Sequence, residues 1–148
     1  MPEPMPSPCR VCGGELGERL PVGIGRSAWH CDRCGWRLGD APDADLRPPR
    51  VEVVYYLRYA ARVKIGTSST PRSRLAAIRH DELLAFEPGG RTLEQQRHRE
   101  FASLREGGEW FTSAAPLTDH IAALQAVQRD PWAAYDRWLG DAFRRLSS

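Results

Sequence analysis

Two pairs of cysteines constrain this chain more than any other feature of its sequence. Each pair has the spacing C-x2-C, first in "CRVCGG" and then in "CDRCGW", and eighteen residues lie between the pairs. Such doubled pairs are typical of zinc sites, because cysteines three residues apart on a tight turn can place both sulfurs about 2.3 Å from one ion. The sequence therefore predicts one structural zinc ion, held by the four ligands Cys9, Cys12, Cys31 and Cys34.

A redox role is the alternative for these cysteines, since a C-x2-C pair is also typical of thioredoxin-like proteins. Two pairs are present, however, and no strand–helix pattern surrounds either of them. The opening "MPEPMPSP" has neither the basic region nor the apolar core of a secretion signal, so we expect a cytoplasmic protein whose thiols stay reduced. His30 adjoins Cys31, but four thiolates already complete a tetrahedron, and we expect no ligand role for it.

The segment that holds the cysteines, residues 9–38, resembles a zinc ribbon. Thirty residues cannot bury a sufficient apolar core alone, so we expect the metal to hold this fold together. Basic and aromatic residues are interleaved here, which suits binding to single- or double-stranded nucleic acid. These residues are Arg10, Arg19, Arg26, Arg33, Arg37, Trp29 and Trp36. A scaffolding ribbon with solvated arginines is the alternative, and the residues leave both open.

Changes in composition divide the chain into parts. The first eight residues are rich in proline, and "GDAPDADLRPPR" holds three prolines and three aspartates, as linkers do. No apolar run approaches the length of a membrane span, so we expect no membrane partner. The expected parts are a disordered tail at 1–8, the ribbon at 9–38, a linker at 39–50, an α/β domain at 51–128 and a C-terminal helix at 129–148.

Strand and helix signals alternate after the linker. "VEVVYYLRY" and "RVKIGTS" are rich in β-branched and aromatic residues, and the short turn between them predicts a hairpin. Pro71 can begin a helix, and Thr92 can cap another. We expect further strands and helices at 82–88, 91–105, 116–128 and from 131 onward. The fold class is therefore α/β or α+β, with a small mixed or antiparallel sheet flanked by helices.

The last of these helices carries an aromatic stripe. Its members are Trp132, Tyr135, Trp138, Leu139 and Phe143. Apolar residues at helical spacing are typical of core packing. A surface for a protein partner is the alternative, which would make the chain an adaptor.

Five short motifs follow one another between residues 51 and 125. They are "VVY", "KIG", an arginine eight residues past that glycine, "LEQQRHREF" and "GEWF". In this order and at these distances they resemble the GIY-YIG nuclease superfamily, and most of all its phage-type branch. The first motif lacks its glycine, and Lys64 stands in place of the tyrosine of the second motif, a replacement that is ordinary in that branch.

The resemblance implies a GIY-YIG fold and a metal-dependent DNA endonuclease from a phage or mobile-element setting. The implied site comprises Tyr55, Lys64, Arg74, Glu94 and His98. Chemistry supports these roles, because a nearby lysine favours a phenolate that can act as general base. Arginine binds phosphate through two hydrogen bonds. Glutamate can hold Mg²⁺ or Mn²⁺, and a histidine four residues later shares its helix face.

The two altered motifs leave an alternative function open, which is a nucleic-acid-binding or regulatory module that keeps the scaffold and does not cut. Tyr56 should point to the opposite face of the strand from Tyr55 and is its rival for the catalytic role. In "GEWF", we expect Glu109 to fix the turn and Trp110 and Phe111 to anchor the core.

Overall fold

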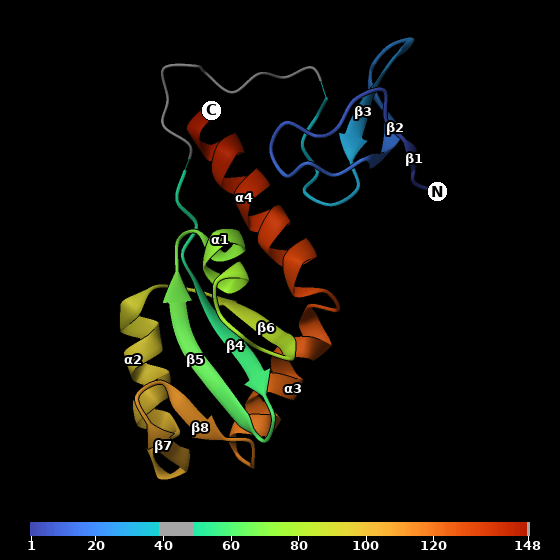
Figure 1. Ribbon diagram of the computed structural model, residues 1–148. Coiled ribbons are helices and arrows are strands. Elements are labelled where there is room, and N and C mark those ends of the chain that lie inside the picture. Colours follow the sequence, from blue (N-terminus) through green and yellow to red (C-terminus); the bar gives the residue numbers. More distant parts are fainter. Residues whose placement is uncertain (39–48, 148) are drawn as a thin grey trace. The chain divides into compact units, whose positions relative to one another are not determined.

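The computed structural model describes residues 1–38 and 49–147 (Figure 1). They form two compact units. Met1–Pro49 and Trp132–Ser148 make up the first unit, and Arg50–Pro131 makes up the second. In the sequence, the second unit therefore lies between the two segments that make up the first unit. Most of the predicted linker at 39–50 lies outside the described residues.

The first unit contains a small antiparallel sheet in the order β1-β2-β3. The strands are β1 (Glu3–Pro4), β2 (Leu16–Gly23) and β3 (Arg26–Cys31). Composition predicts disorder for residues 1–8, yet Glu3 and Pro4 pair with β2. The amide of Met5 also donates to the Glu15 carbonyl at 2.9 Å. These backbone contacts add a third strand that proline content alone does not reveal.

Three of the four cysteines belong to one buried cluster of this unit. Cys9, Cys31, Cys34 and Trp36 are all buried there, and each is 4% exposed or less. Partly buried Met5, Val11, Cys12 and Phe143 pack around them. With so few apolar side chains inside, hydrophobic burial alone is a weak source of stability for this unit.

Helix α4 (Pro131–Ser147) packs on the second cysteine pair. The Phe143 ring meets Trp36 edge-on, with ring centres 6.0 Å apart. Gly140 approaches so closely that a β-carbon there would lie 2.6 Å from the Cys34 carbonyl oxygen. The aromatic stripe of this helix thus contributes to the interior of the ribbon unit.

An ion pair with one buried partner joins the same two elements. Asp136 on α4 is completely buried, and its Oδ2 lies 3.2 Å from a guanidinium nitrogen of Arg33. The carbonyl of Asp32 also accepts a hydrogen bond from Arg137 at 3.2 Å. The C-terminal helix is therefore part of the cysteine unit by packing, by charge and by hydrogen bonding.

The second unit is built on a five-stranded antiparallel sheet in the order β6-β4-β5-β8-β7. Its strands are β4 (Val53–Tyr59), β5 (Arg62–Ser68), β6 (Glu82–Pro88), β7 (Arg105–Gly107) and β8 (Trp110–Thr112). Its helices are α1 (Pro71–Ala76), α2 (Arg91–Glu100), α3 (Leu117–Val127) and the 3-10 turn η1 (Ala102–Leu104). The predicted class, an α+β domain with an antiparallel sheet and flanking helices, is confirmed.

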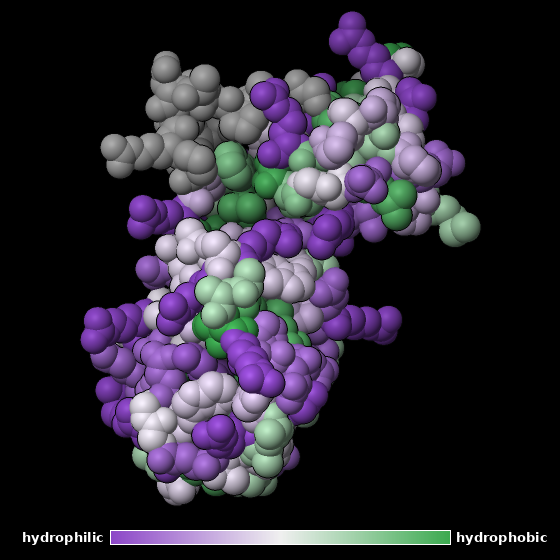
Figure 2. All heavy atoms as spheres, viewed as in Figure 1, coloured by the Kyte–Doolittle hydropathy of each residue, from purple (hydrophilic) through white to green (hydrophobic). Residues whose placement is uncertain are grey.

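Alternation along β4 places successive side chains on opposite faces of this sheet. Val54 and Tyr56 join the main apolar core, together with Phe101, Phe111 and Ile121. In the view of Figure 2, hydrophilic and neutral residues cover most of the second unit, and apolar residues show only in small groups.

Helix α2 begins without the predicted cap, because Gly90 rather than Thr92 holds the N-cap position.

Within the described ranges, no helix combines the length and the apolar character that crossing a bilayer requires.

Candidate functional site

Tyr55 and Gly66 are direct partners in the ladder between β4 and β5. Partners in a ladder point to the same face of the sheet, and the Tyr55 ring lies across the bare backbone of Gly66. A β-carbon at position 66 would lie 2.5 Å from Cζ of Tyr55 and 2.8 Å from Cε2. The glycine of "KIG" therefore makes room for the tyrosine ring.

Lys64 lies two residues before Gly66 and on the same face of β5. Its Nζ is 3.7 Å from Oε2 of Glu109 and 5.7 Å from the ring centre of Trp110, its ladder partner on β8. The side chain of Lys64 is only 17% exposed. Lys64 is thus held in an ion pair with the residue that precedes β8.

Arg74 reaches the Tyr55 hydroxyl from α1. Burial raises the pKa of Tyr55 above its usual value, and the hydrogen bond and positive charge of Arg74 oppose part of that rise. The negative charges of Glu109 and Glu94 raise it further. Three ionisable side chains, from α1, α2 and the turn before β8, therefore lie near enough to Tyr55 to act on its proton.

Glu94 and His98 share one face of α2, since they are four residues apart. Nε2 of His98 donates to the carbonyl of Ile65 at 2.8 Å, because a carbonyl can only accept. This bond ties α2 to the strand residue next to Gly66. Burial and the charge of Glu109 raise the pKa of Glu94, whereas His98 and Arg91 act in the opposite direction.

The residues predicted for the site come from four different elements, yet they form one connected group. Glu109 links its parts, because it pairs with Lys64 and acts electrostatically on Tyr55 and Glu94. The sequence suggested only a turn-fixing role for Glu109. No short spacing in the sequence points to this role, because Glu109 reaches the site through the pairing of Trp110 with Lys64.

The pKa of Tyr55 is governed by groups other than the one that the sequence suggested. Lys64 was expected to favour the phenolate of Tyr55, but the pKa of Tyr55 is raised and not lowered. Lys64 is paired with Glu109, and the cation that acts on the hydroxyl is Arg74. The cost of burying a charged phenolate outweighs the attraction of this one arginine.

Tyr56, the rival tyrosine, lies on the opposite face in a buried polar network. Its hydroxyl donates to Oε1 of Glu87 at 2.8 Å and lies 3.1 Å from Nε2 of His120. Arg97 on α2 holds the same carboxylate with two bonds, of 2.6 and 3.1 Å. Burial raises the pKa of Tyr56 strongly. These partners give Tyr56 a structural role, joining β4, β6, α2 and α3.

The four cysteines of the first unit form a second candidate site. Their sulfurs all lie within 4.8 Å of one another. The Cys9–Cys34 and Cys12–Cys31 sulfur distances are both 3.5 Å, and all four thiols are free of disulfides. Sulfurs on a zinc tetrahedron with 2.3 Å bonds are about 3.8 Å apart. The geometry therefore matches a four-thiolate metal site.

Local structure and charge agree with that assignment. Backbone amides of Gly14 and Trp36 donate to the sulfurs of Cys12 and Cys34, both at 3.4 Å. A hydrogen bond from Cys34 lowers the pKa of Cys12 to about 5, and the same contact raises the pKa of Cys34. Four sulfurs this close cannot all carry negative charge unless a cation lies among them.

Comparisons with protein-family models, with curated proteins and with solved structures find no match to this chain.

Proposed function

We propose that the second unit is a metal-dependent DNA endonuclease of the GIY-YIG type and that the first unit is a zinc ribbon that helps it to bind DNA. The observation that carries this proposal is that Tyr55, whose ring lies across Gly66, has Arg74 at its hydroxyl and feels the charge of Glu94. Hydrolysis of a phosphodiester needs an acid–base group, a cation for the phosphate and a ligand for a metal. The three side chains supply one group of each kind.

The roles of the protein groups follow from their chemistry. Arg74 binds the scissile phosphate through its guanidinium, which matches two phosphate oxygens at once. Tyr55 accepts a proton from the attacking water once its own proton has left, and phosphate-bound Arg74 stays close to the developing charge. His98 holds α2 against β5 through the Ile65 carbonyl. Lys64 and Glu109 keep each other oriented beside this centre.

Glu94 is the residue that would hold the catalytic Mg²⁺ or Mn²⁺. The donor set fits such an ion, because hard divalent cations prefer carboxylate oxygens. Burial and the negative charge of Glu109 raise the pKa of Glu94, and a bound cation would relieve that charge repulsion. When bound, the ion supplies positive charge that stabilises the developing negative charge on phosphate.

For the ribbon, zinc at Cys9, Cys12, Cys31 and Cys34 is structural. Four protein ligands leave no open position for a substrate. The sparse core around these cysteines supports the same view, since metal binding then replaces apolar burial as the source of stability.

A non-cleaving nucleic-acid-binding module is the second candidate. The raised pKa of Tyr55 favours it, because a protonated phenol is a poor base at neutral pH. In that case, Arg74 and Lys64 would bind phosphates and Glu94 would have no metal.

Plasmid cleavage separates the two candidates. We expect the zinc-loaded full chain to nick or linearise supercoiled plasmid when Mg²⁺ or Mn²⁺ is added, and to leave it intact without either ion. If plasmid, linear duplex and single strands all stay uncut under both conditions, the protein is not an endonuclease.

A further inference from the structure

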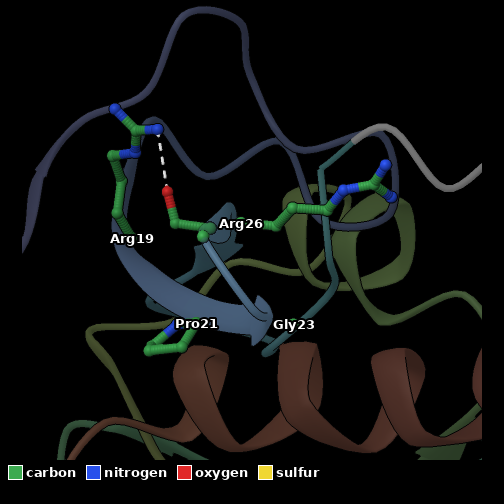
Figure 3. Close-up of a pocket in the computed structure, with 6 residues that line it drawn as sticks. Arg19, Pro21, Gly23 and Arg26 are labelled. Carbon is green, nitrogen blue, oxygen red and sulfur yellow. Dashed lines mark hydrogen bonds between the residues drawn. The ribbon is translucent and has the colours of Figure 1, made fainter.

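The tip of the β2–β3 hairpin in the first unit forms an open hollow of about 460 Å³. Its lining consists of Arg19, Pro21, Gly23, Gly25, Arg26 and Ser27. A β-carbon at Gly23 or Gly25 would have no heavy atom within 4 Å, so these two lining residues face open space. Figure 3 shows Arg19 and Arg26 reaching out from the two strands in different directions.

Arg19 is held in place by two neighbours on β3. Its guanidinium donates to the Ser27 hydroxyl at 2.8 Å, and it lies 5.9 Å from the ring centre of Trp29. Arg19 and Trp29 are direct ladder partners, so they share one face of the hairpin. An arginine whose side chain is already ordered loses less conformational entropy when it binds an anion.

Among the residues that the structure describes, no acidic residue lines this hollow. Glu18 is the only acidic residue of the two strands, and it pairs with His30. Strand alternation places that pair on the opposite face from Arg19 and Trp29. Within residues 1–38 and 49–147, the hollow is therefore a surface with two guanidinium groups and no opposing carboxylate.

We propose that this hairpin is a docking surface for duplex DNA, in which Arg19 and Arg26 each contact a backbone phosphate. A two-stranded β-ribbon has the dimensions to enter the major groove of B-form DNA. Two separated guanidinium groups suit two phosphates along a strand better than a single small anion. The proposal deepens the proposed function, because it names the part of the ribbon that holds the substrate.

The salt dependence of binding provides the test. The affinity of the full chain for a labelled duplex is measured between about 50 and 200 mM salt, with zinc bound and no Mg²⁺ or Mn²⁺, so that no cleavage interferes. We expect Arg19→Gln and Arg26→Gln each to weaken binding and to reduce the slope of log K against log salt by about 1. Ser27→Ala should weaken binding less, since it loosens Arg19 and keeps its charge.

Arg145→Gln is the matched control. Arg145 is an exposed arginine of the same unit that does not line the hollow, and its loss changes net charge by the same amount. If Arg145→Gln lowers the slope as much as the hairpin variants do, only net charge matters and the proposal is wrong. It is also wrong if both hairpin variants bind like wild type, or if they lose binding to anionic phospholipid vesicles while DNA binding is unchanged.

The DNA-binding test of the hairpin and the cleavage test of the proposed function can fail independently of each other. A protein that never cuts DNA can still show the predicted loss of binding in the hairpin variants. Conversely, plasmid cleavage that survives in Arg19→Gln/Arg26→Gln with unchanged DNA affinity would leave the endonuclease standing and overturn the docking surface.

Discussion

Single residues decide the chemistry of the Tyr55 hydroxyl. Gly66 lets the ring cross the strand, and burial then holds the proton on the hydroxyl by raising its pKa. Arg74 lowers the pKa of Tyr55, but this effect is smaller than the increase that burial causes. A tyrosine in this position becomes a strong base only when it loses that proton, which ties the proposed reaction to pH.

The rate of cleavage should therefore increase with pH. Because the pKa of Tyr55 is raised above its ordinary value of about 10, the phenolate fraction grows about tenfold per pH unit throughout the range from 7 to 9. We expect the single-turnover rate of wild type to follow this slope. Tyr55→Phe should lower the rate about 100-fold or more, as loss of a general base does.

Tyr59→Phe is the control for that variant, because Tyr59 lies on the same strand but stacks edge-on against Trp110. It should cleave at nearly the wild-type rate. A flat profile between pH 7 and 9 in wild type would show that another group takes the proton.

Glu94 provides the second residue-scale prediction. Glu94→Gln removes the negative charge and keeps the shape, so the stabilisation that a bound metal provides should fall by about 3 kcal/mol, or roughly 100-fold in cleavage rate. DNA binding should be unchanged or slightly tighter, because a negative charge near the phosphates is gone.

Glu100→Gln is its matched control, since Glu100 lies on the same helix and pairs with Arg97 at its exposed end. That change should leave cleavage close to wild type. Equal rates for Glu94→Gln and wild type would point to another metal ligand or to a contaminating nuclease.

At the scale of elements, helix α4 depends on the metal site on which it packs. Gly140 and Phe143 contact Cys34 and Trp36, so the position of the second cysteine pair determines the surface that receives the helix. We expect wild type to contain one zinc per chain and Cys31→Ser to lose it. Limited proteolysis should then cut within residues 131–147, because the ribbon that covers the helix has unfolded.

A Cys31→Ser protein that keeps its zinc and a protected C-terminal helix would show that the metal assignment is wrong. Elemental analysis of protein purified without added metal measures the zinc content directly. The proteolysis pattern reports on the helix, and the two measurements together show whether metal and helix are linked.

The ion pair between Arg33 and the buried Asp136 leads to a separate prediction about the same helix. Asp136 is completely buried against Arg33, so Asp136→Ala should destabilise the first unit by about 1–3 kcal/mol. The exposed Asp141 pairs with Arg144 within the helix, and Asp141→Ala should change stability by less than about 0.5 kcal/mol.

Chelator titration followed by fluorescence compares these two variants. The Asp136→Ala protein should lose its metal at a lower chelator concentration than wild type, whereas Asp141→Ala should match wild type. Identical curves for the two variants would mean that the pair does not hold the helix to the ribbon.

At the scale of the whole molecule, the two ends of the chain build one unit and the middle builds the other. The second unit has its own sheet and apolar core. We therefore expect a fragment of residues 50–131 to fold by itself, with a single cooperative thermal transition. It should keep slow cleavage and bind DNA more weakly, because the ribbon is gone.

A fragment of residues 50–148 is the informative comparison. It keeps α4 but lacks Trp36 and the cysteines on which that helix packs. The exposed apolar face of α4 should then bind a hydrophobic dye that the fragment of residues 50–131 does not bind. An insoluble or molten 50–131 fragment would show that the ribbon belongs to the core of the second unit.

Several features followed from the sequence because they depend on short spacings. Cysteines three residues apart form a metal site through a local turn, and the four sulfurs do meet. Alternation along one strand was enough to separate Tyr55 from Tyr56. The hairpin and the helices of the second unit follow from patterns a few residues long, and the structure has them within a few residues of the expected bounds. The sequence left a mixed or an antiparallel sheet open, and the strand pairing decides for the antiparallel one.

Other features were decided only by the tertiary structure. Helix α4 packs on a cysteine pair about a hundred residues earlier in the sequence, and no local pattern specifies which surface an apolar stripe will meet. Glu109 joins the site because β8 pairs with β5. The raised pKa of Tyr55 depends on how many groups from distant segments exclude water from its ring. Burial and nearby charges shift a pKa through all the groups that surround a side chain in space, and the chain brings those groups together only when it folds.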